Sequence, residues 1–281
     1  MIIGITGATG QLGRAVIAAL KARETGHEII GLARNPERVA DLGVAIRPFD
    51  YDAPDTLAAM LKGVDRLLLI SSSENGRRRV QHPAVIEAAK QAGVSLIAYT
   101  SILHAGTSPI TLAEEHRDTE AGLRASGLSW VILRNSWYSE NFMGQVPRAL
   151  ECGNYVGATG GAHITSASRG DYAEAAAEVL VGEGHAGRIY ELTGDIPFTL
   201  FDLCAEVTRQ SGRAVRYNDM TPGAYASALK GSGMSEDVAD FLSGIDAALA
   251  QGALYDVSRD LSHLIGRPTT PLSEIIAKAL A

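Results

Sequence analysis

Short apolar runs alternate along the first half of the chain with segments whose apolar residues recur every three or four positions. Six runs are predicted to be strands: 1–6, 27–32, 44–48, 64–73, 95–101 and 128–133. The continuous apolar run within 64–73 is typical of a strand buried on both faces of a parallel sheet. Five intervening segments have helical spacing: 11–22, 37–42, 56–61, 83–94 (with Pro83 expected in the first turn) and 112–126. This alternation predicts an α/β fold, a doubly wound parallel sheet of Rossmann type with right-handed crossovers.

The alternation weakens after Leu133. Residues 136–165 are rich in glycine and aromatic residues, and 188–195 have the composition of a strand that returns to the sheet. Further helices are predicted at 200–210, 222–229, 236–250 and 272–280. We therefore expect a Rossmann domain at 1–134 and a smaller, mainly helical C-terminal substrate lobe at 135–281. Parts of 166–195 are expected to return to the Rossmann sheet.

The stretch GATGQLG lies between the first predicted strand and the first predicted helix. Its glycines let backbone N–H groups and the positive end of the helix dipole approach a pyrophosphate. A flexible turn is the alternative, but the strand before the loop and the helix after it favour a dinucleotide site. The residues expected in this site are Gly7, Ala8, Thr9, Gly10, Gln11, Leu12 and Gly13.

The second strand ends at Arg34, where a site selective for NAD would offer an acidic side chain to the ribose. The guanidinium can bind the 2′-phosphate of NADPH through two hydrogen bonds, so we expect NADPH rather than NADH. A solvated arginine is the alternative. Ser71, Ser72 and Ser73 end the fourth strand and would let a ribose approach the backbone, unless they only form a turn. The basic run 77–79 is interpreted as a solvated patch.

Composition and charge restrict the classes of protein that remain. The chain has 281 residues, of which 46% are hydrophobic and 20% charged, which is ordinary for a folded globular protein. A net charge of −7 argues against direct binding to nucleic acid. The two cysteines, Cys152 and Cys204, are expected to be buried thiols. No signal peptide or membrane span is apparent, so a cytoplasmic location is expected. The seven histidines form no pair with metal-ligand spacing, so no metal site is expected.

The expected acid/base pair of a short-chain dehydrogenase is missing. Leu112 and His116 occupy the positions of its tyrosine and lysine, and neither Tyr99 nor Tyr138 begins another such pair. Ser101 fits the position of the hydroxyl that assists the tyrosine. His116 could polarise a bound acceptor, although a structural histidine is the alternative. Without a placed proton donor, the sequence favours an easily reduced acceptor such as a quinone, or a protein without turnover.

Taken together, the motifs GITGATGQLG, GLARNP, LLLISSSE, LAEEHRDTEAGLRASG and ILRNSWYSENF resemble the NmrA-like, atypical short-chain dehydrogenase family. Within it the chain is most similar to NADPH-dependent quinone reductases, with triphenylmethane reductases next. The resemblance implies NADPH in the cleft between the domain and the lobe, and two-electron reduction of quinones without flavin or metal. It also implies the alternative of a regulatory protein that senses NADP(H).

Carried onto matching positions, the resemblance puts the nicotinamide side of the cofactor near Ser71–Ser73 and near Tyr138, Ser139, Glu140 and Asn141. Trp137, Tyr138 and Phe142 would form an aromatic wall for a flat acceptor, with core packing as the alternative. The candidate catalytic residues are Ser101, His116 and Tyr138. The physiological acceptor and the oligomeric state are left open.

Overall fold

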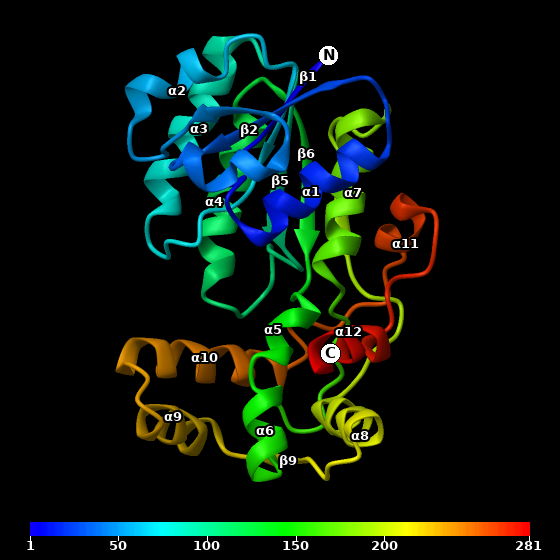
Figure 1. Cartoon of the computed structure of the whole chain (residues 1–281). Coiled ribbons are helices and arrows are strands. Elements are labelled where there is room, and N and C mark those ends of the chain that lie inside the picture. The colour runs from blue at the N-terminus through cyan, green and yellow to red at the C-terminus, as the bar shows by residue number, and fades with distance from the viewer.

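A sheet of seven parallel strands forms the centre of the upper part of the molecule (Figure 1). The computed structural model describes residues 1–281. The strand order is β3-β2-β1-β4-β5-β6-β8, so the order reverses between β1 and β4. The strands are β1 (Ile2–Ile5), β2 (Glu28–Ala33), β3 (Ala45–Pro48), β4 (Arg66–Leu69), β5 (Leu96–Ile102), β6 (Ser129–Asn135) and β8 (Ile189–Leu192). The Rossmann-type sheet predicted from the sequence is confirmed.

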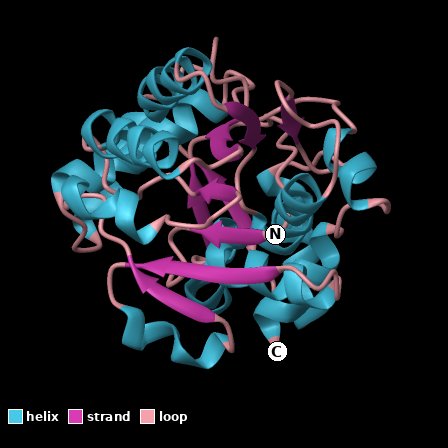
Figure 2. Cartoon of the chain, turned by 90° about the horizontal axis from the view of Figure 1, so that it is seen from above, coloured by secondary structure: helices cyan, strands magenta, loops and turns pink.

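Helices cover both faces of this sheet (Figure 2). On one face, α1 (Gln11–Ala22) and α7 (Arg169–Val181) pack against β1 through a core that includes Ile3, Ile5 and Val16. On the other face, α2 (Pro54–Met60), α3 (Arg78–Ala92) and α4 (Leu112–Ala125) pack around Leu67 and Leu69. The short 3-10 helix η1 (Pro36–Leu42) connects β2 to β3. Strands buried on both faces explain the continuous apolar runs in the sequence.

A smaller lobe lies below the carboxyl ends of the strands (Figure 1). It contains α5 (Ser139–Met143), α6 (Val146–Cys152), β7 (Asn154–Gly157), α8 (Leu200–Ser211), β9 (Arg216–Asp219), α9 (Pro222–Gly231), α10 (Glu236–Leu249) and α12 (Leu272–Leu280). The helix α11 (Asp260–Ile265) packs against the upper core through Leu261. β7 and β9 form a parallel pair that the sequence did not predict, because neither strand is a continuous apolar run. None of the helices is both long and apolar enough to cross a membrane.

Two local predictions need correction. The helix α3 begins at Arg78 and not at Pro83, so Pro83 lies inside it. The earlier start is held by Glu115 of α4, whose carboxylate accepts the N–H groups of Gly76 and Arg78. This contact between helices cannot be seen in local sequence. The expectation of two buried thiols is correct for Cys204 only, because Cys152 is exposed at the end of α6.

Candidate functional site

A cavity lies where the strand order reverses, beyond the carboxyl ends of β1 and β4. It has a volume of about 510 Å³, and 20 residues line it. Parallel α/β sheets bind their ligands at such a reversal. The sequence-predicted residues among the lining are Gly7, Thr9, Gly10, Gln11, Leu12, Gly13, Arg34, Ser71, Ser72, Ser73 and Tyr138. Segments far apart in sequence therefore meet at one site because their strands end at the same edge.

The glycine-rich loop presents unpaired N–H groups to this cavity. Gly10 caps α1 without a side chain, and the N–H groups of Gln11, Leu12 and Gly13 have no acceptor in the protein. Gly7 has a φ of 59°, in the left-handed region that favours glycine. A Cβ on Gly13 would clash with the Gly7 carbonyl, since it would lie 2.9 Å from its carbon. Free donors at a helix N-terminus fit a pyrophosphate, so the loop can hold a dinucleotide.

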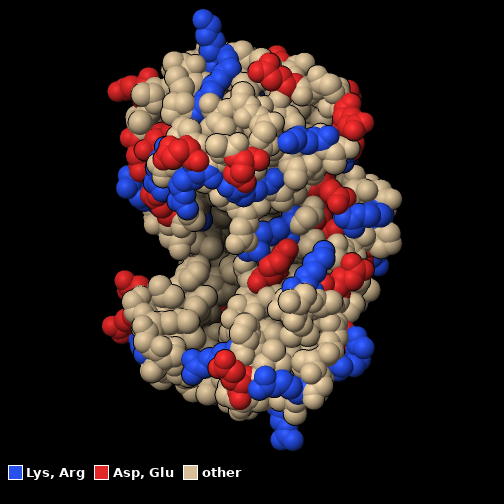
Figure 3. Space-filling view, viewed as in Figure 1, with Lys and Arg blue, Asp and Glu red and all other residues tan.

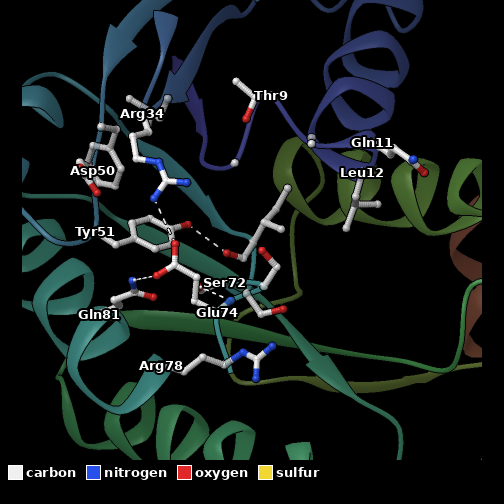
Figure 4. Close-up of a pocket in the computed structure, with 18 of the residues that line it drawn as sticks. Thr9, Gln11, Leu12, Arg34, Asp50, Tyr51, Ser72, Glu74, Arg78 and Gln81 are labelled. Carbon is white, nitrogen blue, oxygen red and sulfur yellow. Dashed lines mark hydrogen bonds and ion pairs between the residues drawn. The ribbon is translucent and has the colours of Figure 1, made fainter. Parts of the chain in front are cut away.

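Arg34 lines the cavity and forms an ion pair with Glu74 (Figure 4). Its Nη1 is 3.1 Å from Oε1 of Glu74, and its side chain is 60% exposed. Gln81 donates to the other carboxylate oxygen of Glu74 at 3.2 Å. The guanidinium is therefore accessible to a phosphate, which would compete with Glu74 for it.

The end of β3 contributes lining residues that the sequence analysis missed, namely Phe49, Asp50 and Tyr51. The Tyr51 hydroxyl is 2.6 Å from the Thr6 hydroxyl and 2.9 Å from the Ile70 carbonyl, which ties β3 to the ends of β1 and β4. Burial raises the pKa of Tyr51 well above its ordinary value, so the hydroxyl stays protonated. The rule that strand ends carry the site could have found these residues, because they directly follow a predicted strand.

Tyr138 and Arg169 form the far wall of the cavity. The Arg169 guanidinium lies over the Tyr138 ring, 4.7 Å from its centroid. Asn141 accepts from the Arg169 guanidinium at 2.6 Å, and Glu140 accepts from its backbone N–H at 3.0 Å. The sequence analysis did not identify Arg169, because it belongs to the first turn of α7, more than 30 residues after β6.

Four expected cofactor contacts lie outside the residues that line the cavity. Glu140 and Asn141 hold Arg169, and the Ser139 hydroxyl is 2.8 Å from that of Ser166. Ala8 is fully buried, and its N–H donates to the Leu32 carbonyl. In the structure these residues support the cavity wall, and their assignment as direct cofactor contacts stays a prediction.

Two of the three catalytic candidates also lie outside the cavity lining. Ser101 is 6% exposed and donates to Glu120 at 2.7 Å. His116 is 5% exposed, and its Nδ1 is 2.6 Å from the Tyr99 hydroxyl. Burial, together with the charge of Arg78, lowers the pKa of His116 to about 3, so the ring is neutral and is no proton donor near neutral pH. Ser101 and His116 therefore make structural contacts away from the cavity lining, and Tyr138 is the one candidate that lines it. A catalytic role for any of the three stays a prediction.

The expected aromatic wall is reduced to one ring. Phe142 packs edge-to-face on Phe198 in the core of the lobe, with ring centroids 5.8 Å apart. Trp137 packs against the same core. The alternative of core packing is correct for both residues, because the loop after β6 turns them down into the lobe.

Comparison with known proteins agrees with a dinucleotide site in this cavity. A family model described as NAD(P)H-binding matches residues 7–182. The chain is 48% identical over 279 residues to quinone oxidoreductase 2 of Escherichia coli, covering 98% of each chain. The structure of the E. coli NADPH-dependent quinone oxidoreductase complexed with NADPH has a TM-score of 0.96 and 48% identity, covering 99% of this chain and 100% of that one. The Citrobacter sp. triphenylmethane reductase complexed with NADP(H) has a TM-score of 0.94 and 36% identity, covering 99% of each chain.

Proposed function

The chain belongs to the NAD(P)H-binding family, and from that premise we propose that it is an NADPH-dependent reductase that transfers two electrons to quinones. The full-length identity of 48% to a quinone oxidoreductase carries this proposal. A regulatory protein without turnover is not favoured, because the relatives of 36% identity and above are named as reductases or oxidoreductases. The cytoplasmic location expected from the sequence stays a prediction.

The lining residues supply what such a cofactor needs. The free N–H groups of 11–13 would bind its pyrophosphate, and Arg34 would bind the 2′-phosphate. Ser71–Ser73 would lie along the ribose, since small side chains leave the backbone accessible there. Tyr138, held by Arg169, would limit how far the nicotinamide end can move. The donor set therefore fits NADPH.

When bound, NADPH supplies a hydride for transfer to an adjacent acceptor. Reduction of a quinone to a hydroquinone consumes that hydride and one proton. We assign the proton to water, because His116 is neutral and Ser101 donates to Glu120. The chain acts by holding cofactor and acceptor together and by limiting access of water. Figure 3 shows a hollow between the upper part and the lobe whose visible walls carry few charged side chains, which suits a flat, uncharged acceptor.

Mixing the purified protein with NADPH and 1,4-benzoquinone tests the proposed function. We expect the absorbance of the reduced nicotinamide to fall with enzyme-dependent kinetics, with one hydroquinone formed per NADPH consumed. No flavin or metal should be needed, so dialysis against a chelator should leave the rate unchanged. Tight binding of NADPH without enzyme-dependent oxidation, across a series of quinones, would instead support the sensing alternative.

Replacing Glu74 by glutamine is expected to tighten NADPH binding by about three- to tenfold. The carboxylate competes with the 2′-phosphate for Arg34 and repels it, whereas the amide does neither. Affinity for NADH should change less than twofold, since NADH lacks that phosphate. Titration of both cofactors by fluorescence measures the effect, with Glu114→Gln as the control at an exposed acidic position on α4. An equal change for both cofactors would contradict the proposed competition.

A further inference from the structure

Arg78 is a buried arginine that faces the cavity. It is the first residue of α3, is 5% exposed and is one of the lining residues. Its neighbours Arg77 and Arg79 have side chains that are 56% and 52% exposed and form ion pairs at the surface. Successive side chains at the start of the helix point about 100° apart, and of these three only Arg78 is buried. The run of three basic residues therefore contains one internal cation.

The ion pair that holds Arg78 leaves part of its guanidinium free. Nη1 is 2.9 Å from Oε2 of Glu115. The same carboxylate also accepts the N–H groups of Gly76 at 3.1 Å and of Arg78 at 3.2 Å, so it is committed to the start of α3. Nε of Arg78 is buried and has no partner. Nη2 also makes no hydrogen bond within the protein and, unlike Nε, is not sealed from solvent, so it is the donor that an oxygen of a molecule in the cavity can reach.

Glu115 is the one carboxylate within ion-pair distance of Arg78. His82 accepts the Ser72 N–H at its Nε2 and contacts the Thr119 hydroxyl through Nδ1. Burial and the nearby charge of Arg78 lower the pKa of His82 to about 3, so this ring is neutral as well. Figure 4 shows Arg34 and Arg78 on opposite sides of Glu74. Three cations therefore line the cavity, because Arg169 is there as well. A phosphate is expected at Arg34 and Arg169 is held by Tyr138 and Asn141, which leaves Arg78 without an assigned role.

We propose that Arg78 binds the oxygen of the quinone on which negative charge builds during reduction. This inference rests on the proposed function. The hydride brings two electrons and one hydrogen to the quinone, leaving NADP⁺ and a hydroquinone monoanion that takes one proton from water. The guanidinium donates hydrogen bonds to the anionic oxygen and keeps its own protons. Such stabilisation of developing charge in a water-poor site accelerates a reaction without a proton donor. It also accounts for a reductase that lacks the tyrosine–lysine pair.

Arg78→Gln, compared with Arg79→Gln, tests the inference. We expect Arg78→Gln to lower kcat/KM for benzoquinone by about 30-fold, as loss of a charged donor to a developing oxyanion does. Its dissociation constant for NADPH should stay within twofold of the wild type. The loss should grow as the quinone becomes a poorer electron acceptor, since such quinones depend more on stabilisation of the anion. Arg79→Gln should behave as the wild type, because its side chain pairs with Asp118 and Glu114 at the surface.

A binding measurement without turnover separates this inference from the proposed function. In the presence of NADP⁺, 4-nitrophenol serves as a flat analogue of the hydroquinone, and its absorption distinguishes phenol from phenolate. The wild type should lower the apparent pKa of the bound probe, and Arg78→Gln should not. Arg78→Lys retains a charge that can pair with Glu115, so it should restore this shift only in part. It provides a second folded variant if Arg78→Gln does not fold.

Three outcomes would overturn the role of Arg78. An unchanged kcat/KM in folded Arg78→Gln would show that the acceptor does not contact it. A parallel loss of NADPH affinity would place Arg78 in the cofactor site. If both variants still lowered the pKa of bound 4-nitrophenol as the wild type does, a group other than Arg78 would bind the anionic oxygen. If the wild type oxidises no NADPH with any quinone but shifts the probe through Arg78, the proposed function fails while the anion site stands.

Discussion

Gly13→Ala is expected to lower the affinity for NADPH by about 100-fold or more, the size of effect that a displacement of about 1 Å has in a preorganised site. The added Cβ would lie 2.9 Å from the carbonyl carbon of Gly7 and 3.0 Å from Cα of Ala8, which is backbone that cannot yield as a flexible side chain does. The start of α1 must therefore move away from β1. The three free N–H groups that point at the cavity move with it.

Fluorescence titration with NADPH, accompanied by thermal unfolding, measures this effect. Gly122→Ala is the matched control, because a Cβ there meets only Ile86 at 3.7 Å in ordinary contact. Alanine is also the better helix former, so the control should be as stable as the wild type or more stable. If folded Gly13→Ala bound NADPH with unchanged affinity, the glycine-rich loop would not be the pyrophosphate site.

Arg34→Ala is expected to weaken NADPH binding by about 100-fold and NADH binding by less than twofold. A guanidinium makes two charge-assisted hydrogen bonds to a phosphate, and each such bond contributes roughly 1.5–3 kcal/mol. The side chain is 60% exposed, so screening by water and salt keeps the effect at the lower end of that sum. The change should therefore shrink as the salt concentration rises.

The ratio of the two dissociation constants, measured at low and moderate salt, checks this prediction. Arg209→Ala is a control for net charge, because that arginine is similarly exposed and pairs with Glu206 on α8 in the lobe. An unchanged NADPH to NADH ratio in Arg34→Ala would remove Arg34 from the 2′-phosphate site. Equal losses for both cofactors would indicate a distorted cavity instead of a lost phosphate contact.

Much of the fold could be predicted because its signals are local. Six strands of the sheet were expected within the first 133 residues and all six are present, since most of them form buried apolar runs; β3, at the edge of the sheet, is partly exposed. The limits of the first helix, Gln11–Ala22, match the prediction because glycine ends the loop before it and the apolar spacing is regular. The strands β7 and β9 were not predicted, because neither forms a continuous apolar run and they pair only within the lobe.

Part of the candidate site could likewise be predicted from local sequence, and part could not. The glycine loop, Arg34 and Ser71–Ser73 were found because each directly follows a strand, and strand ends of a parallel sheet meet at one edge. Ser101 and His116 were assigned by position alone, and the structure pairs them with Glu120 and Tyr99 instead. Whether a polar side chain faces a ligand or a neighbour depends on contacts between elements, which position in a motif does not reveal.

The sequence by itself determined the parallel sheet, the place of the glycine loop and the position of Arg34, because these depend on periodicity and on residues adjacent to strands. Only the tertiary structure decided which of Arg77, Arg78 and Arg79 is internal. The three are chemically identical, and the difference arises because Glu115, on another helix, is placed to compensate one buried charge. A charged side chain can be buried only where the fold places a group of opposite charge beside it, and here that group is distant in the sequence.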